Sequence, residues 1–313
     1  MKVLLDTMSG DVPPGEIIKG AVQALRETGD NQLGITLVGK EELNRELVDE
    51  LQPGTDPDRI SYLHASSTIS MEDTPAKAAR NNPDSSLVKG IKALKEDSEI
   101  FVSSGNTGAV VAAALFNLGR ITGVERPGLA GVIPTVKSGN VVLIDIGATT
   151  DASPKNLAQF GVMGKVLAEI VTDKEDPKVG VLNIGEEQTK GNKLTKKAVS
   201  LMKESDLKYA GNVEPHLLLT EPPADVVICE GFVGNILIKA FEGAVDGTMG
   251  FFREAISSDL RSKFGGLVLR PTLKRLKNQL SYSQFGAVPL LGVNGVVYVA
   301  HGRSGERAIK NAI

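Results

Sequence analysis

The sequence is poor in cysteine and histidine and contains no long apolar run. Its single cysteine, Cys229, excludes a disulfide within the chain and a zinc site built from cysteines. The 3 histidines lie far apart in the sequence and no HExxH motif is present, so no metal site is expected. No stretch approaches the roughly 20 apolar residues of a membrane-spanning helix. These absences predict a soluble cytoplasmic protein.

Net charge and missing motifs narrow the function further. The formal net charge of −3 does not indicate the basic surface that nucleic-acid binding requires, so no nucleic-acid partner is expected. No G-x-G-x-x-G follows a strand-like segment, and Lys190 precedes Gly191, whereas the lysine of a Walker A motif follows its glycine. No G-x-S-x-G marks a serine nucleophile. The sequence therefore lacks the common signatures of dinucleotide binding, P-loop hydrolysis and serine catalysis.

Short apolar segments alternate with amphipathic ones along most of the 313 residues. Apolar runs at 100–102, 141–146, 179–184 and 226–229 each lead into a loop of small polar residues and then a helical pattern. This alternation predicts an α/β protein with a doubly wound, largely parallel sheet. We expect one α/β unit over residues 1–313, with residues 64–86 mostly loop.

Residues 236–282 are helical in pattern, with interruptions expected at Gly265-Gly266 and Pro271. We expect a protruding helical hairpin, an excursion over residues 240–282. Residues 253–279 hold seven basic residues against two acidic ones, which leaves five positive charges around a central apolar group. Two interpretations remain open and can coexist: the hairpin packs on a partner subunit, or its apolar part rests on an anionic membrane surface.

Two loops are suited to bind an anion. One follows the strand predicted at 179–184 and carries Lys190 just before a predicted helix, where ligands bind in open α/β sheets. The other is Ser103-Ser104-Gly105-Asn106-Thr107-Gly108, whose glycines allow close backbone approach. On the residues alone, the lysine could be merely solvated, the glycines merely packed, Asn235 merely a helix cap, and Cys229 a buried small apolar residue.

A series of ordered motifs supports a more specific interpretation. They are Asp6-Thr7-Met8-Ser9-Gly10-Asp11, Ser104-Gly105-Asn106-Thr107-Gly108-Ala109, Asp145-Ile146-Gly147-Ala148, Lys190-Gly191-Asn192, Gly211-Asn212-Val213-Glu214, Glu230-Gly231-Phe232-Val233-Gly234-Asn235, Pro289-Leu290-Leu291-Gly292 and Ala300-His301-Gly302. With these motifs, the chain resembles the phosphate acyltransferase family of bacterial phospholipid synthesis (PlsX). Departures at Ser9, Thr149, Val233 and Arg303 indicate a divergent member.

The resemblance implies an enzyme that moves a fatty acyl group from acyl carrier protein to inorganic phosphate, forming acyl phosphate. It also implies an isocitrate/isopropylmalate dehydrogenase-like fold, a homodimer, no metal or cofactor, and peripheral contact with the inner face of the cell membrane. The implied catalytic residues are Lys190 and Asn235. The implied substrate-binding residues are Gly10, Ser104, Gly105, Asn106, Thr107, Gly108, Asp145, Gly147, Glu186, Asn192, Glu230, Gly231, Gly234, His301 and Gly302.

The residue inventory agrees with acyl transfer to phosphate. The phosphate dianion is already a nucleophile near neutral pH and a thiolate leaves readily, so neither a triad nor a metal is required. The enzyme needs an anion site and a donor to the oxyanion. Two alternatives stay open: a phosphotransacetylase-like enzyme using short-chain acyl-coenzyme A, and a non-catalytic paralogue that binds acyl carrier protein or membrane. An NAD-linked dehydrogenase is disfavoured because no acid-rich metal site is evident.

Overall fold

The chain divides into two compact units. A computed structural model describes residues 1–29, 32–51, 56–94, 99–137, 139–280 and 286–313. The first unit comprises Met1–Gly131, Gly147–Ala152 and Phe285–Ile313, and the second comprises Val132–Ile146 and Ser153–Gln284. Each unit is described on its own below. The prediction that residues 1–313 act as one α/β unit stays a prediction.

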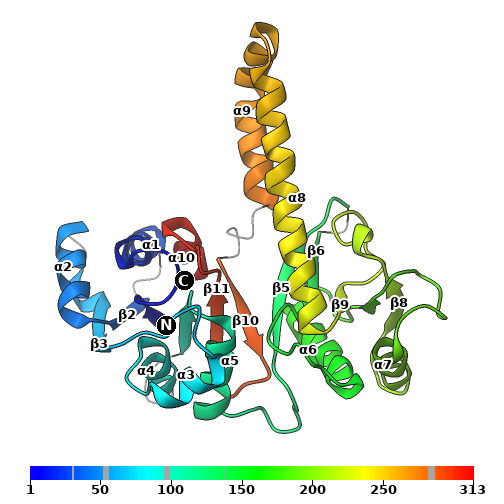
Figure 1. Cartoon of the computed structure of the whole chain (residues 1–313), viewed down its shortest axis with the longest axis horizontal. Helices are drawn as coiled ribbons and strands as arrows, with labels where there is room; N and C mark the ends of the chain where they lie inside the picture. Colours follow the sequence, from blue (N-terminus) through cyan, green and yellow to red (C-terminus); the bar gives the residue numbers. More distant parts are fainter. Residues whose placement is uncertain (30–31, 52–55, 95–98, 138, 281–285) are drawn as a thin grey trace. The chain divides into compact units, whose positions relative to one another are not determined.

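The first unit is built on a mainly parallel sheet with the strand order β3-β2-β1-β4-β11-β10-β5 (Figure 1). Neighbouring strands are parallel except at β10, which runs antiparallel to β11 and to β5. Its strands are β1 (Lys2–Asp6), β2 (Gly34–Gly39), β3 (Ile60–His64), β4 (Ile100–Ser103), β5 (Gly128–Pro134, which continues into the second unit), β10 (Ala287–Leu291) and β11 (Val296–Ala300).

Helices cover both faces of this sheet. Figure 1 shows α1 and α10 on one face and α3, α4 and α5 on the other. The helices are α1 (Pro14–Glu27), α2 (Glu41–Leu51), α3 (Pro75–Asn81), α4 (Ser86–Ala93), α5 (Thr107–Asn117) and α10 (Glu306–Ala312), with a 3-10 turn at Pro57–Arg59. In α1 the apolar residues recur on one side, and Ile17, Ile18 and Val22 are fully buried against strand residues such as Leu5. This burial explains why the amphipathic pattern folds as a helix over the sheet.

The strands of the second unit run parallel to one another, in the order β6-β9-β7-β8. Its strands are β6 (Asn140–Ile144), β7 (Val179–Leu182), β8 (Tyr209–Val213) and β9 (Val226–Ile228). Its helices are α6 (Pro154–Thr172), α7 (Lys193–Lys203), α8 (Gly231–Ser257) and α9 (Leu260–Leu280), with a 3-10 turn at Pro215–Leu217. A Cβ atom at Gly164 of α6 would lie 2.6 Å from Val226, whereas Phe241 of α8 packs with Val227. Successive residues of β9 point to opposite faces, so α6 and α8 cover opposite sides of this sheet.

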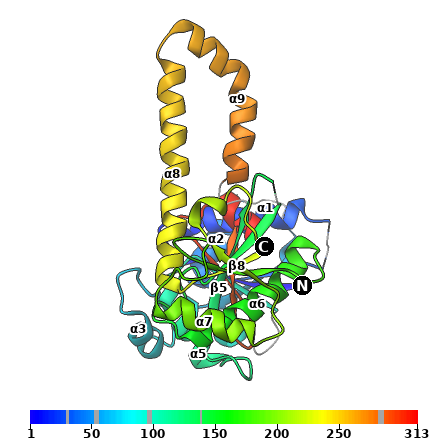
Figure 2. The same ribbon diagram turned by 90° about the vertical axis from the view of Figure 1, so that its right-hand side faces the viewer.

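Helices α8 and α9 form a hairpin that protrudes from the second unit, as predicted. Figure 2 shows the two helices side by side, extending away from the sheet of their unit. The expected interruptions are wrong, because Gly265-Gly266 and Pro271 lie inside α9 and the chain turns at Ser258-Asp259 instead. Asp259 caps α9: its carboxylate accepts from the amides of Arg261 and Ser262, at 2.8 and 2.9 Å. Residues 281 and 282 of the predicted excursion lie outside the described residues.

Helix α8 itself starts at Gly231, soon after β9, and the predicted boundary of the excursion at residue 240 stays a prediction. The segment at 64–86 is not loop alone, because it contains α3. None of the described helices combines the length and the hydropathy that crossing a membrane requires.

Candidate active site

In the first unit, three loops leave neighbouring strands at the same level. β4 is flanked by β1 and β11, all three are parallel, and the register pairs Leu5 with Val102 and Val299 with Ser103. The loops after these strands therefore start side by side at the carboxyl edge, where open α/β sheets bind ligands. They contain Gly10, Ser104 and Gly302, which the sequence predicted to contact substrate.

The carboxylate of Asp6 organises two of these loops. Asp6 is buried, and its Oδ2 accepts a hydrogen bond from Ser103 Oγ at 2.8 Å. Its Oδ1 accepts from the backbone amides of Met8 and Ser9, at 3.1 and 3.3 Å. A buried carboxylate needs such donors, so this set fixes the loop after β1 against the loop after β4. Asp6 belongs to the first of the sequence motifs, but its role in positioning the two loops is visible only in the structure.

Gly10 brings the three loops into contact. Its φ of +103° suits glycine, and an added Cβ would lie 2.6 Å from Ser104 Oγ and 3.1 Å from Gly302 O. The amide of Asp11 donates to Gly302 O at 2.7 Å, and Ser104 Oγ donates to Ser9 O at 2.9 Å. The structure thus places Gly10, Ser104 and Gly302 together, and their role in substrate binding stays a prediction. We call the loops at residues 6–11, 103–108 and 301–304 the anion cradle.

The start of α5 supplies the donors of this cradle. Asn106 caps the helix by accepting from the amide of Ala109 at 3.1 Å, and its side-chain nitrogen donates to Met71 O at 3.1 Å. Helix geometry leaves the first amides of α5, those of Thr107 and Gly108, without a partner inside the helix, and such amides bind anions. His301 accepts from the amide of Arg303 at 3.2 Å within its own loop.

In the second unit, a second group of candidate residues lies at the carboxyl edge of the sheet. The register pairs Ile144 of β6 and Val181 of β7 with Ile228 of the strand between them, β9. The loops that begin with Asp145, Asn183 and Cys229 therefore leave the sheet at nearly the same level. Gly147, in contrast, follows β6 but belongs to the first unit.

Two asparagines hold the loop that carries Lys190. Asn183 at the end of β7 donates to Lys190 O at 3.4 Å, and Asn212 of β8 donates to Glu187 O at 2.7 Å. The loop then enters α7, where the side chain of Asn192 caps the helix by accepting from the amide of Thr195 at 2.9 Å. The Lys190 side chain is exposed. The sequence motifs do not indicate these roles of Asn183 and Asn212, although amide side chains at strand ends next to a loop with a lysine are a usable signal.

The start of α8 packs tightly against the end of β6. Glu230 caps α8 by accepting from the amide of Phe232 at 2.8 Å. Asn235 lies inside the helix, so the alternative that Asn235 is only a helix cap is wrong. A Cβ at Gly234 would lie 2.0 Å from the backbone oxygen of Asp145, so glycine is required for this contact. The predicted Gly231, Gly234 and Glu230 thus shape the helix start.

Cys229 is a buried thiol next to this contact, as expected of a small apolar residue. Its Sγ donates to Asp145 O at 3.3 Å. Burial raises the pKa of the Cys229 thiol well above its ordinary value, and the nearby carboxylates of Asp145 and Glu230 act in the same direction. A protonated, buried thiol is a poor nucleophile.

The predicted site residues separate into two groups by what their side chains bind. Ser104, Asn106, Asn192 and Glu230 each use their side chain in a cap or loop hydrogen bond. In the part of the chain that the structure describes, the side chains of Lys190 and Asn235 make neither an ion pair nor a hydrogen bond, and both are exposed. The side chain of Glu186 is also exposed. The first group positions the loops, and the second is available to reactants.

The fold is that of the phosphotransacylases. A phosphotransacetylase from Streptococcus pyogenes aligns with a TM-score of 0.59 at 16% identity, covering 100% of this chain and 92% of that one. A branched-chain phosphotransacylase from Enterococcus faecalis gives 0.56 at 13% identity, covering 100% of this chain and 96% of that one. These likenesses concern the fold alone, and they confirm the predicted α/β class.

The sequence comparisons define the family. The family model described as "Fatty acid synthesis protein" matches residues 1–313, so the chain belongs to this family. Curated relatives include the phosphate acyltransferase of Halothermothrix orenii, 45% identical over 100% of this chain and 93% of the relative. Those of Desulfitobacterium hafniense and Dictyoglomus turgidum are 40% and 42% identical, each over 100% of this chain and 92% of the relative. The resemblance seen in the sequence motifs is therefore confirmed.

Proposed function

We propose that the protein transfers a fatty acyl group from the thioester of an acyl carrier protein to inorganic phosphate. The relatives named phosphate acyltransferase, at 40–45% identity over the whole chain, support acyl transfer to phosphate. The observation that carries the residue assignment is the availability of Lys190, whose side chain is exposed on a loop held by Asn183 and Asn212.

The reaction needs no nucleophile from the protein. A phosphate oxygen attacks the thioester carbonyl carbon, a C–O bond forms, and the C–S bond breaks to release the carrier thiolate, which takes up a proton. The ammonium group of Lys190 offsets the negative charge of phosphate and of the developing oxyanion. The side-chain amide of Asn235 donates a hydrogen bond to the oxyanion. Such donors stabilise the transition state more than the ground state.

Trapping acyl phosphate with hydroxylamine tests the proposal. The wild-type protein is expected to consume acyl-carrier thioester and yield hydroxamate only when phosphate is present. Lys190→Ala should lower kcat about 100- to 1,000-fold, the usual effect of removing one oxyanion donor. Lys197→Ala, at an exposed position on the neighbouring helix α7, removes the same charge and should leave kcat unchanged. Binding of the carrier without phosphate-dependent turnover would support the non-catalytic alternative instead.

The phosphotransacetylase-like alternative differs in its donor. It is supported by the fold shared with phosphotransacetylases, at 16% identity. Comparing kcat/KM for a long-chain acyl-carrier thioester with that for acetyl-coenzyme A distinguishes the two. The proposed function requires the carrier thioester to be the better donor.

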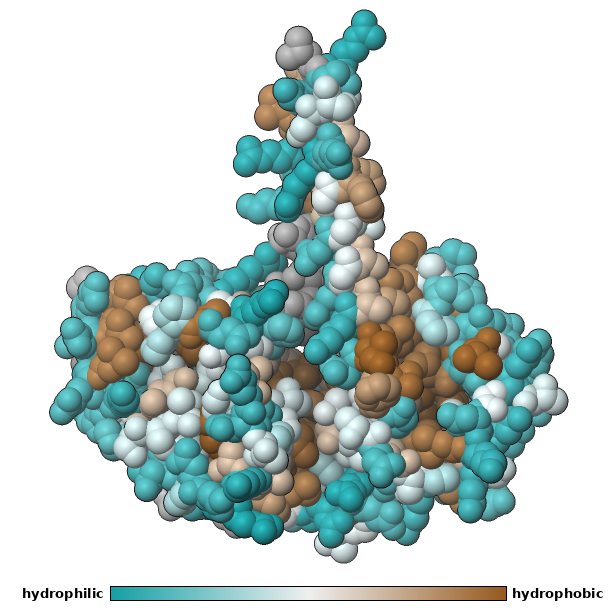
Figure 3. Space-filling view, in the orientation of Figure 1, coloured by the Kyte–Doolittle hydropathy of each residue, from teal (hydrophilic) through white to brown (hydrophobic). Residues whose placement is uncertain are grey.

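We further propose that the protein is a homodimer joined through the second unit. Val162, Val166 and Ile170 form a stripe at i, i+4 and i+8 on α6, with exposed fractions of 51%, 54% and 75%. Figure 3 shows hydrophobic atoms gathered around the base of α8 as well. Exposed apolar stripes of this kind mark interfaces. Ile170→Asp should halve the mass measured by light scattering, whereas Val136→Asp, on an exposed loop of the same unit, should not.

The hairpin is proposed to contact an anionic membrane. Near its turn, Phe251, Phe264 and Leu267 are exposed at 75%, 71% and 65%, and Arg261 and Lys263 lie beside them in the sequence. Apolar side chains flanked by cations bind anionic lipid surfaces. Leu267→Asp should reduce co-sedimentation with phosphatidylglycerol vesicles, and unchanged co-sedimentation would refute the contact. Thr248→Asp, on the exposed flank of α8, adds the same charge as a control.

A further inference from the structure

A pocket with arginines at its rim lies at the carboxyl end of α5 in the first unit. It has a volume of about 520 Å³, opens to solvent and is lined by Leu115, Arg120, Glu125 and Arg126. Leu115 belongs to the last turn of α5, and the other three come from the loop that follows this helix. We call this feature the arginine pocket. None of its residues belongs to the anion cradle or to the loop that carries Lys190.

A third arginine and two apolar side chains extend this surface. The guanidinium of Arg80, from α3, lies over the ring of Phe116 at 4.9 Å from its centre. Phe116 is 47% exposed, and Ile121 in the following loop is 48% exposed. Arginine beside exposed aromatic and aliphatic groups is the composition typical of protein interfaces.

The cations of this surface are available for a partner. Nη1 of Arg120 donates to Glu125 O at 2.6 Å, a backbone contact that fixes its direction without neutralising it. The side chain of Glu125 lines the same pocket and has contacts of its own, whereas no ion pair is found for Arg80, Arg120 or Arg126 among the described residues. Arginines that are held in place but not neutralised attract an acidic partner and increase its rate of association.

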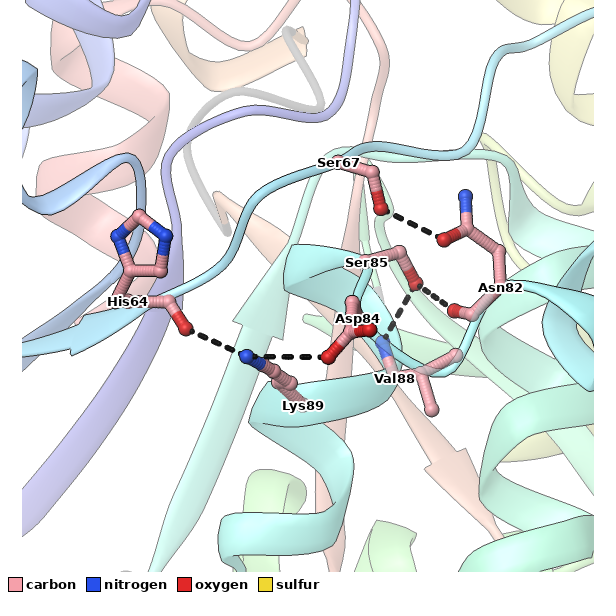
Figure 4. Close-up of polar contacts among 7 residues, drawn as sticks. All are labelled: His64, Ser67, Asn82, Asp84, Ser85, Val88 and Lys89. Atoms are coloured by element: carbon pink, nitrogen blue, oxygen red, sulfur yellow. Dashed lines mark hydrogen bonds and ion pairs between the residues drawn. The ribbon is translucent and has the colours of Figure 1, made fainter.

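Local hydrogen bonds fix the segment that carries Arg80. Asn82, directly after α3, accepts from Ser67 Oγ at 2.6 Å and from Ser85 Oγ at 2.8 Å (Figure 4). The next helix, α4, is tied back in turn, because Lys89 Nζ donates to His64 O at 3.1 Å (Figure 4). The position of α3, and with it that of Arg80, is therefore set before any partner binds. A preorganised surface loses less entropy on binding.

Helix α5 connects this surface to the anion cradle. The helix starts at Thr107 in the cradle and ends at Asn117 beside the pocket, a length of 11 residues. At 1.5 Å per residue it spans about 16 Å. A carrier protein presents its thioester at the tip of a long flexible pantetheine arm. The middle of α5 is buried, so the arm of a carrier docked at the arginine pocket would cover about this distance over the helices that pack on α5 to reach the cradle.

We propose that the arginine pocket, with Arg80 and Phe116, docks the acidic acyl carrier protein that delivers the acyl group. The inference rests on the proposed function, because it names the docking surface of the donor. Charge complementarity favours a carrier protein over a second copy of this chain, whose formal net charge is only −3. The apolar groups Phe116 and Ile121 would bury against the carrier while the arginines pair with its carboxylates.

Kinetics with two donors test the docking. Arg126→Glu and Arg80→Glu are each expected to lower kcat/KM for acyl-carrier thioester about tenfold, the lower end of electrostatic steering effects. Acyl-pantetheine, which lacks the carrier, should be used with unchanged kcat/KM. Arg126→Lys keeps the charge and should retain most of the activity. Arg26→Glu, at an exposed position in the last turn of α1, makes the same charge change away from the pocket and should have no effect.

Three outcomes would overturn the proposal. One is an equal loss with both donors, which would indicate damage to the site. Another is an unchanged kcat/KM for the carrier thioester in both reversal variants. The third is conversion to a monomer by Arg126→Glu, which would make the surface a contact between copies. Calorimetric titration with acyl carrier protein separates this inference from the proposed function: if the wild type turns over neither donor, weaker carrier binding by Arg126→Glu still supports docking, and equal binding refutes it.

Discussion

The contact between α8 and the end of β6 gives the sharpest test of the fold around the candidate catalytic asparagine. A Cβ atom added at Gly234 would lie 2.0 Å from the backbone oxygen of Asp145 and 2.9 Å from its carbonyl carbon. Ordinary contacts of a Cβ atom start near 3.4 Å. The helix or the strand end must therefore move by more than an ångström in Gly234→Ala, and neither neighbour is a flexible side chain.

The expected cost combines two opposing effects. Overpacking of a tight interior contact costs about 1–3 kcal/mol, and a backbone neighbour places this site near the upper value. Replacing glycine by alanine inside a helix stabilises the folded state by up to about 1 kcal/mol. Gly234→Ala should thus lower the free energy of unfolding of the second unit by about 2 kcal/mol. Gly243→Ala in the same helix, where no heavy atom lies within 4 Å of the added Cβ, should raise it by about 0.5–1 kcal/mol.

Urea denaturation of both variants, followed by far-ultraviolet circular dichroism, measures this difference. We expect the two variants to differ by about 3 kcal/mol, with opposite signs relative to the wild type. Acyl transfer should also fall in Gly234→Ala, because Asn235 follows directly in α8. If Gly234→Ala is as stable as Gly243→Ala, the close packing of α8 on Asp145 is refuted.

Other perturbations give further predictions. Because burial raises the pKa of the Cys229 thiol, the native protein should not react with Ellman's reagent at pH 8, and one thiol per chain should appear in denaturant; a rapidly reacting native thiol would contradict this. Ser103→Ala removes a hydrogen bond to the buried Asp6 carboxylate and should lower the free energy of unfolding by about 1–3 kcal/mol in the same denaturation assay. Hydrogen bonds from Lys165 and Lys208 lower the pKa of Asp176 in the folded protein. The ionised Asp176 carboxylate therefore stabilises the fold at pH values above the ordinary pKa of aspartate, and this stabilisation is lost as the pH falls through the lowered pKa. The stability difference between wild type and Asp176→Asn should therefore be present at about pH 6 and vanish near about pH 2; a constant difference would refute it.

The sequence predicted the parts of the fold in which local pattern and burial agree. The strands β4, β6, β7 and β9 lie at the predicted apolar runs, and each run is followed by a helix as the alternating pattern predicted. One strand that was not predicted, β8, lacks such a pattern. β8 contains Gly211 and Asn212, which are poor strand formers, and it is a strand because its backbone pairs with β7.

In the hairpin, the sequence-based prediction was wrong for the opposite reason: local helix propensity predicted breaks in the helix that do not occur. Gly265-Gly266 and Pro271 are unfavourable inside a helix, yet α9 continues through them. The break instead lies where Asp259 caps the new helix. The sequence Ser258-Asp259 carried this signal, since aspartate is a strong N-cap residue. A capping side chain determined the turn, and the helix-disfavouring residues did not.

The candidate site was predictable as a set of loops but not as a division of roles. Motifs name Ser104, Asn106 and Lys190 alike, whereas the structure engages the first two in loop and cap hydrogen bonds and leaves the lysine available. A side chain that is hydrogen-bonded to the backbone of its loop cannot bind a substrate instead without destabilising that loop. Its substitution should therefore reduce stability and phosphate binding together, whereas Lys190→Ala should reduce kcat at unchanged stability. Measuring stability beside kcat for each variant separates positioning residues from those that contact the reacting atoms, which no order of motifs along a chain can do.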